Sequence, residues 1–353
     1  MAATKQRQFG FTFLLFIPLL AYWSYDTFVK WYTRKGIRQE QRGKELSEIA
    51  ASADTSDEAT QQQLQAADAL LTAVSYSKAF SNILQGVIGP PDCLVIVSLL
   101  RRDDTKGLID GLQLVLKLSV TTAENKIILL KNGVGEELCR LIRSHKDLPT
   151  SVSILVINAI NNLSLSEGGQ LQFASLVGPF LDVCMGEDNS LAVAALQSLT
   201  NLSVTTDCHE SFTRVVQSLY NLLDSHSDRQ IQVCKVLVNL SSNSTLVPYL
   251  LAAKRPECSF QLIEADDALR WLRFLVNISH IVLSEGITDM SLPTIYKAAS
   301  PDTMYSFLYG VTNQSRLSNL LLYKRSRGDE ELNQLHNELY KNINFRALSV
   351  PGS

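Results

Sequence analysis

A pattern of apolar and polar positions recurs along the middle of the chain and ends each time in Asn-Leu-Ser or Asn-Ile-Ser. Counted from that asparagine, the residues six, five and two positions before it and one position after it are apolar in four copies. Those positions share one face of a helix with about 3.6 residues per turn. The pattern therefore predicts four amphipathic helices. They cover residues 156–164, 195–203, 233–241 and 271–279.

The spacing of these copies predicts a repeat architecture. A fifth copy, residues 111–119, matches except that Lys117 replaces the asparagine. The serines that end the five copies follow one another at steps of 45, 39, 38 and 38 residues. Repeats of about 40 residues built from two or three helices are typical of α-solenoids. These serines are Ser119, Ser164, Ser203, Ser241 and Ser279.

Further helical stretches lie between the copies, for example Glu136–Ser144 after the chain-breaking Gly133 and Gly135. One such group of helices cannot bury its apolar face alone, but stacked neighbours can. We therefore expect residues 75–285 to form an all-α solenoid whose third helices line a concave surface. Residues 286–353 depart from the period, and we expect capping helices there. One of them is expected to begin with Ser300 as N-cap and Pro301 at its first position.

The N-terminal segment has the pattern of a membrane span. Residues 8–25 carry no charge and are mostly apolar, and eighteen helical residues reach about 27 Å, close to the hydrocarbon thickness of a bilayer. We predict a single transmembrane helix with a basic flank over residues 1–35, followed by a polar, partly helical spacer over 36–74. A cleaved signal peptide and a buried or interfacial helix are the alternatives.

Basic residues are more frequent after the span than before it, six against two. The positive-inside bias then leaves the body of the protein in the cytosol. A short span with dense basic flanks fits the mitochondrial outer membrane, and the endoplasmic reticulum is the alternative.

Composition narrows the function class. Hydrophobic residues make up 46% of the chain and the net charge is −3, which supports a sizeable core and argues against nucleic-acid binding. The six cysteines are scattered without a paired spacing, so we interpret them as buried, reduced thiols and predict no metal site and no cofactor. No nucleotide-binding or hydrolase motif is present, so an enzyme on a helical scaffold is the least favoured reading.

An Asn-Leu-Ser motif that closes a third helix at this period resembles armadillo repeats. Residues 199–212 and 232–241, together with the anchor and its basic flank, are similar to the mitochondrial armadillo family of armadillo repeat-containing protein 10 and its X-linked relatives. This resemblance implies residence on the mitochondrial outer membrane and a role in mitochondrial distribution and dynamics. It also implies Miro GTPases and TRAK motor adaptors as partners.

The motif asparagines are the candidate protein-binding residues: Asn162, Asn201, Asn239 and Asn277. In peptide-binding armadillo proteins this position hydrogen-bonds the backbone of an extended ligand, and an amide can both donate and accept. The alternative is local, with each asparagine bonded to the solenoid itself. Four residues earlier, where nuclear-import relatives carry tryptophan, this chain has Asn158, Gln197, Lys235 and Arg273. Lys235 and Arg273 would repel a basic peptide and favour an acidic or neutral one.

Taken together, the sequence predicts a non-enzymatic, membrane-anchored scaffold that recruits partner proteins through its groove and contacts the lipid bilayer through residues 9–25. A soluble or endoplasmic-reticulum-anchored armadillo adaptor in transport or signalling is the alternative.

Overall fold

The computed structural model describes residues 85–225, 227–265, 268–323 and 329–349. The predicted anchor, 1–35, and the predicted spacer, 36–74, lie outside these residues. Among the described helices, none combines the length and the apolar character that crossing a bilayer requires. Contacts divide the chain into one unit that ends at Ser98 and a second unit that begins at Leu99. Helix α3, Pro90–Leu100, crosses that boundary.

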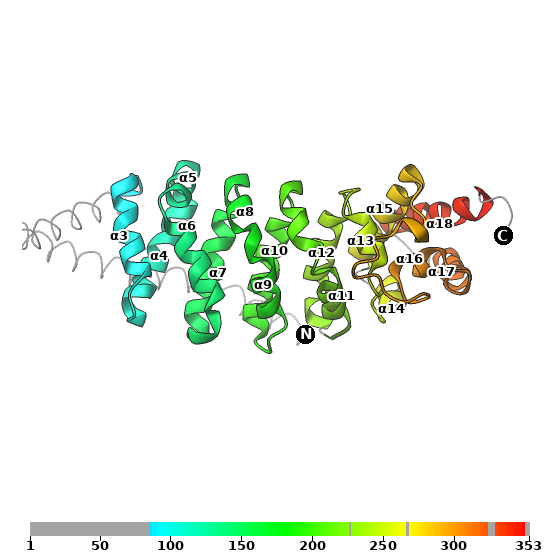
Figure 1. Ribbon diagram of the computed structural model, residues 1–353, viewed down its shortest axis with the longest axis horizontal. Coiled ribbons are helices and arrows are strands. Elements are labelled where there is room, and N and C mark those ends of the chain that lie inside the picture. The colour runs from blue at the N-terminus through cyan, green and yellow to red at the C-terminus, as the bar shows by residue number, and fades with distance from the viewer. Residues whose placement is uncertain (1–84, 226, 266–267, 324–328, 350–353) are drawn as a thin grey trace, which may run out of the picture. The chain divides into compact units, whose positions relative to one another are not determined.

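The second unit is a stack of helices, and no strand occurs among its described residues beyond one isolated bridge between Lys254 and Thr303. Six helices form a row in which each packs on the next along the chain (Figure 1). We call them the row helices. They are α4 (Thr105–Thr121), α7 (Thr150–Leu163), α10 (Asn189–Leu202), α12 (Gln230–Leu240), α15 (Leu269–Glu285) and α18 (Glu330–Ser349).

Further helices connect the row helices and complete each repeat. They are α5 (Ala123–Lys131), α6 (Val134–Arg143), α8 (Glu167–Phe173), α9 (Val177–Cys184), α11 (Val216–Ser225), α13 (Val247–Ala252), α14 (Ser259–Glu264), α16 (Met304–Tyr309) and α17 (Val311–Tyr323). Single 3-10 turns lie at His145–Asp147, Ala174–Leu176, Thr206–Phe212, Ser227–Arg229 and Asp289–Ser291. The all-α solenoid predicted from the sequence is thus confirmed for this unit.

Local sequence sets several helix starts. Gly133 has φ 87°, a left-handed conformation that glycine adopts without steric cost, and α6 begins directly after it. Gly135, expected to break the chain, lies inside α6. Before α10, the Asp188 carboxylate accepts a hydrogen bond from the Leu191 N–H at 3.0 Å, which satisfies a donor that the first helical turn leaves free.

The apolar stripe read from the sequence forms the core. All sixteen positions of the four complete copies are buried, and burying a large aliphatic side chain contributes about 1.5–3 kcal/mol. The stripe explains why the repeats stack, since these side chains face the neighbouring helices. They are Val156, Ile157, Ile160, Leu163, Ala195, Leu196, Leu199, Leu202, Val233, Cys234, Leu237, Leu240, Trp271, Leu272, Leu275 and Ile278.

Two buried charged residues join successive parts of the stack. Arg229 is 2% exposed, and its guanidinium donates to the carbonyl oxygens of Cys184, at 2.6 Å, and Gly186, at 3.0 Å. The Glu137 carboxylate accepts from Arg101 and Arg140, each at 2.7 Å. Burial acts to raise the pKa of Glu137, but the hydrogen bonds from the two arginines outweigh it and the pKa lies below its ordinary value.

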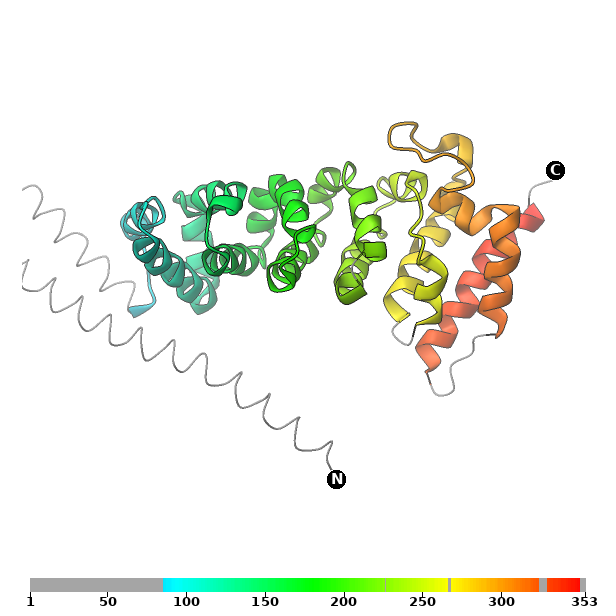
Figure 2. The same cartoon turned by 90° about the horizontal axis from the view of Figure 1, so that it is seen from below.

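The C-terminal segment corrects one sequence-based expectation. The helix start at Ser300-Pro301 is wrong, because α16 begins at Met304, where the Thr303 hydroxyl accepts from the Ser306 N–H at 3.0 Å. The segment departs from the period of the repeats, as expected, and its helices extend the row. Helices α17 and α18 lie side by side and α18 packs on α15 (Figure 2).

Candidate functional site

The motif asparagines connect successive row helices. The side-chain nitrogen of Asn162 donates to the Ser119 hydroxyl of the preceding repeat at 3.2 Å. The same bond recurs from Asn239 to Ser203 at 2.9 Å. It recurs again from Asn277 to Ser241, also at 2.9 Å. We call Asn162, Asn201, Asn239 and Asn277 the asparagine ladder.

Asn201 makes a variant of this contact. Its nitrogen donates to both the backbone carbonyl and the side-chain oxygen of Asn161, at 3.3 and 2.5 Å. The partner is therefore again the preceding row helix, α7, although the acceptor is an amide instead of a hydroxyl. All four ladder nitrogens act within the solenoid, as the local interpretation of the motif predicts.

The serines explain why the motif ends in a hydroxyl residue. Each motif serine is buried and donates its proton to a carbonyl of its own helix, as Ser203 does to Thr200 at 2.7 Å. Its oxygen then has lone pairs left, and those of Ser119, Ser203 and Ser241 accept from the next repeat, whereas Asn201 donates to Asn161 and not to Ser164. Ser203, for example, donates to a carbonyl at the end of its own helix and also accepts from Asn239, which holds the next row helix in place.

The ladder side chains keep one group available. Among the described residues, none donates a hydrogen bond to the side-chain oxygen of a ladder asparagine, and none of these four oxygens is buried. Each ladder amide therefore uses its NH₂ group inside the protein and presents its carbonyl oxygen to solvent. That arrangement can receive the N–H of an extended peptide backbone.

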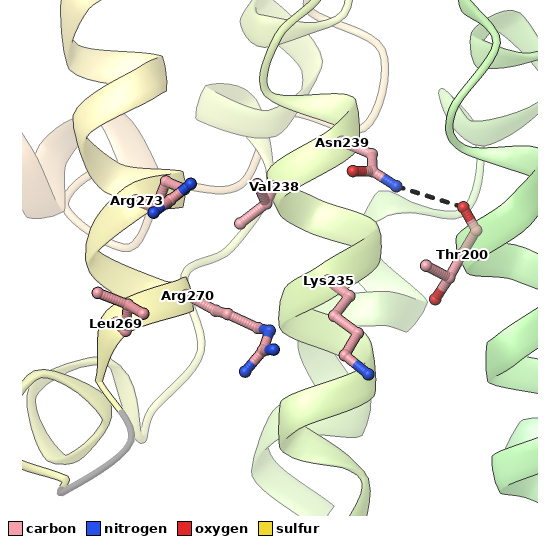
Figure 3. Close-up of a pocket in the computed structure, with 7 residues that line it drawn as sticks. All are labelled: Thr200, Lys235, Val238, Asn239, Leu269, Arg270 and Arg273. Carbon is pink, nitrogen blue, oxygen red and sulfur yellow. Dashed lines mark hydrogen bonds between the residues drawn. The ribbon is translucent and has the colours of Figure 1, made fainter.

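Two neighbouring hollows place three of these amides on one surface. The first, of about 340 Å³, is lined by Asn161, Asn162, Leu165, Gln197, Thr200, Asn201, Gln232 and Lys235. The second, of about 370 Å³, is lined by Thr200, Lys235, Val238, Asn239, Leu269, Arg270 and Arg273 (Figure 3). Because the hollows share Thr200 and Lys235, they follow one another across α7, α10, α12 and α15. We call them together the groove. Asn277 is not among its lining residues.

Charge divides the groove. The first hollow is lined by amides, a threonine, one leucine and Lys235, whereas the second adds two arginines. The Lys235 ammonium donates to the Gln232 side-chain oxygen at 3.0 Å. Arg273 forms an ion pair with Glu331 of α18. The two sequence-predicted cations therefore do line the groove, but one of them already carries a counter-ion.

Sequence reasoning missed residues of both the ladder and the groove, and three of them matter for the argument. Asn342 of α18 donates to the Ser279 hydroxyl at 3.0 Å and so adds a rung to the ladder. Arg270 lines the second hollow from the first turn of α15. Thr200 joins the two hollows and its carbonyl also accepts from Asn239 at 3.3 Å. Residue 200 directly precedes a motif asparagine, which is the signal that could have identified it.

The remaining reactive groups are structural in character. Five of the six cysteines are buried and Cys258 is half-buried. Burial raises the pKa of Cys184 to about 12 and that of Cys139 to about 11, so both are thiols at neutral pH. Within the described residues, no group of histidine, cysteine and carboxylate side chains has the arrangement of a metal site.

Comparisons with known proteins agree with this geometry. An armadillo-like family model matches residues 142–285. A designed armadillo repeat protein is similar with a TM-score of 0.53 at 13% identity, covering 70% of this chain and 98% of that chain. Another, solved in complex with the peptide (KR)4, has a TM-score of 0.51 at 14% identity and the same coverages. An engineered protein from structural genomics has a TM-score of 0.51 at 15% identity, covering 72% of this chain and 97% of that chain.

At these identities the structural likeness shows the fold, and the family match is to a repeat family rather than to a catalytic one. Armadillo repeats are typically non-enzymatic binding scaffolds, in which stacked helices present an extended surface. Residues 142–285 therefore match an armadillo-like repeat family, and the described helices from α4 on build an all-α solenoid of the armadillo type.

Proposed function

We propose that this protein is a non-enzymatic scaffold that binds an extended segment of a partner protein in the groove. The observation that carries the proposal is the orientation of the ladder amides. Their nitrogens hold the preceding repeat, and their solvent-accessible oxygens stand in successive repeats. A backbone N–H of an extended ligand can donate to such an oxygen without disturbing the bond that stacks the repeats.

The designed armadillo protein that carries the peptide (KR)4 supports the proposal at the level of the fold. Another structural neighbour is described as designed for modular peptide recognition, with a TM-score of 0.50 at 12% identity. Both share the armadillo-type fold with this chain. The partner of the present chain differs from the basic peptide (KR)4, because the groove of this chain contains Lys235, Arg270 and Arg273, which repel basic side chains.

A photoreactive residue placed in the groove tests the proposal. Gln197 is exposed and lines the first hollow, so a photo-crosslinker there should capture a bound segment in intact cells. Asn221 provides a matched control, since it is an exposed amide on α11 that lines neither hollow. We expect crosslinked partner chains from position 197 and none of the same partners from position 221. Equal capture from both positions, or capture from 221 alone, would refute groove binding.

We further propose that residues 9–25 anchor the scaffold in the mitochondrial outer membrane, with the repeats in the cytosol, where it acts in mitochondrial distribution and dynamics. The support is the uncharged apolar run and its basic flank. Miro GTPases and TRAK motor adaptors are the proposed partners, on the resemblance described above. Anchoring would raise the local concentration of the groove at the membrane surface.

Carbonate extraction of mitochondria tests the anchor. The full chain should stay in the membrane pellet, and a variant with two arginines in the middle of residues 9–25 should be released, because charge at the centre of a span is costly. Release of the unaltered chain would favour the soluble adaptor. Retention in endoplasmic-reticulum membranes rather than mitochondria would favour the other alternative.

A further inference from the structure

The second hollow is cationic, and its charges come from two successive row helices. Lys235 lies on α12, and Arg270 and Arg273 lie one turn apart on α15. Figure 3 shows the Arg270 side chain reaching from α15 toward α12, on the side where the Lys235 side chain extends. Among the described residues that line this hollow, none is acidic. The hollow therefore concentrates positive charge beside a ladder acceptor, Asn239.

One carboxylate is already present at the edge of the hollow. Glu331, in the first turn of α18, forms an ion pair with Arg273. Both side chains are about half exposed, at 53% and 47%, so the pair is in contact with solvent and contributes little stability. A weak, exposed pair can exchange partners at little cost. Glu331 thus binds Arg273, one of the three cations, as the carboxylate of a ligand would.

The other two cations have no such counter-ion in the described structure. Lys235 hydrogen-bonds a neutral amide, and no ion pair links Arg270 to a described residue. Asp266 and Asp267, which precede α15, lie outside the described residues. The first hollow, by contrast, is lined by Asn161, Gln197 and other uncharged groups apart from the shared lysine.

We propose that the second hollow selects an acidic segment of the partner, and that Glu331 competes with the carboxylates of that segment for Arg273. This proposal rests on groove binding and adds the chemical class of the ligand. Acidic side chains of the bound segment lie over α12 and α15, and its uncharged residues lie over α7 and α10. A basic segment is excluded by repulsion, including the lysines and arginines that follow residue 29 of this chain.

Substitutions of Arg270 or Lys235 and of Glu331 are expected to change the affinity in opposite directions. The probe is a fluorescent peptide of alternating Asp and Glu, compared with peptides of alternating Lys and Arg and of alternating Ser and Gly, by anisotropy with the full chain. We expect the acidic peptide to bind tightest, and Arg270→Glu or Lys235→Glu to weaken it about tenfold. Glu331→Gln should instead strengthen it about threefold, because Arg273 no longer has a competing carboxylate.

Lys131→Glu is the matched control, because Lys131 is exposed on α5, lines neither hollow and gives the same change in net charge. It should leave the affinity within about twofold. Equal weakening by all the lysine and arginine changes would show general attraction and overturn the assignment. So would unchanged binding in Arg270→Glu, or no gain in Glu331→Gln.

Two further outcomes separate this proposal from the one it rests on. If crosslinking from Gln197 captures partners but the anisotropy is indifferent to peptide charge, groove binding stands and acid selection fails. If probe affinity rises when the acidic residues of segment 45–58 are replaced by amides, the occupant is the chain's own spacer, and the assignment to a partner is overturned. If a photo-crosslinker at position 197 captures no partner chain, groove binding itself is refuted.

Discussion

The bond between Asn239 and Ser203 gives the most quantitative prediction about how the repeats are joined. Asn239→Ala removes two hydrogen bonds, to the Ser203 hydroxyl at 2.9 Å and to the Thr200 carbonyl at 3.3 Å. The Ser203 hydroxyl still donates to Thr200, so the substitution leaves no buried donor without a partner. At about 0.5–1.5 kcal/mol net for each bond, we expect a loss of about 2 kcal/mol in the free energy of unfolding.

Ser203→Ala removes the acceptor from the other side and should cost a similar amount. Because the two substitutions remove the same bond, the double variant should be about 1 kcal/mol more stable than the sum of the single losses predicts. Lys235→Ala on the same helix, α12, is the control and should change stability by less than about 0.5 kcal/mol.

Urea unfolding measured by far-UV circular dichroism and by tryptophan fluorescence is the assay. Trp271 is buried in α15, the next row helix. In a chain whose Trp23 and Trp31 are replaced by phenylalanine, its emission therefore reports whether the loss of the bond separates neighbouring repeats. Coincident transitions by the two probes justify a single free energy of unfolding. Strictly additive losses in the double variant would refute the claim that Asn239 and Ser203 join the repeats.

Three further substitutions test the packing of the stack. Gly169→Ala should destabilise by about 2 kcal/mol in urea unfolding, since its Cβ would overlap the Leu163 carbonyl, whereas Gly168→Ala, with open space around it, should be neutral or stabilising; equal effects would contradict this. Glu137 has a lowered pKa in the folded state, so its contribution is present above its ordinary pKa and is lost as the pH falls. Between neutral and acidic pH, the free energy of unfolding should therefore fall less in Glu137→Gln than in the unaltered chain. If it falls equally in both chains, the ion pairs of Glu137 do not contribute to stability. Arg229→Met leaves two carbonyls without a donor and should cost about 3 kcal/mol by the same assay, while a loss below about 1 kcal/mol would contradict its role.

The fold was predictable because the pattern that specifies it is local and repeated. Apolar positions around each motif asparagine recur at nearly constant spacing, and all of them are buried. The motif asparagine of the last repeat, Asn342, was not predicted, and the reason is physical. The loop between α15 and α16 lengthens the step from Asn277 to Asn342 to 65 residues, and the motif there ends in Asn344 in place of serine. Only the contact between α15 and α18 reveals that Asn342 occupies the position of a ladder asparagine.

The candidate site was predictable in part. Lys235 and Arg273 were identified from their distance to a motif asparagine, and both line the groove. Arg270 lies one residue before the fourth copy of the pattern, residues 271–279. Because α15 already begins at Leu269, Arg270 is part of the helix and lines the hollow. The ion pair between Arg273 and Glu331 joins residues 58 positions apart, so no local pattern indicates it. Sequence likewise left open which atom of each ladder amide acts inside the protein, because that depends on the acceptor oxygen that the preceding repeat presents.

The central claim is that ladder oxygens accept hydrogen bonds from the backbone of a bound segment. Methylating the backbone nitrogens of the acidic peptide one at a time, and measuring each affinity for the full chain, tests it directly, because each methyl group removes one donor and leaves every side chain in place. The account predicts a large loss of affinity at a periodic subset of positions and little change at those between them. Affinity that is unchanged at every methylated position would contradict it.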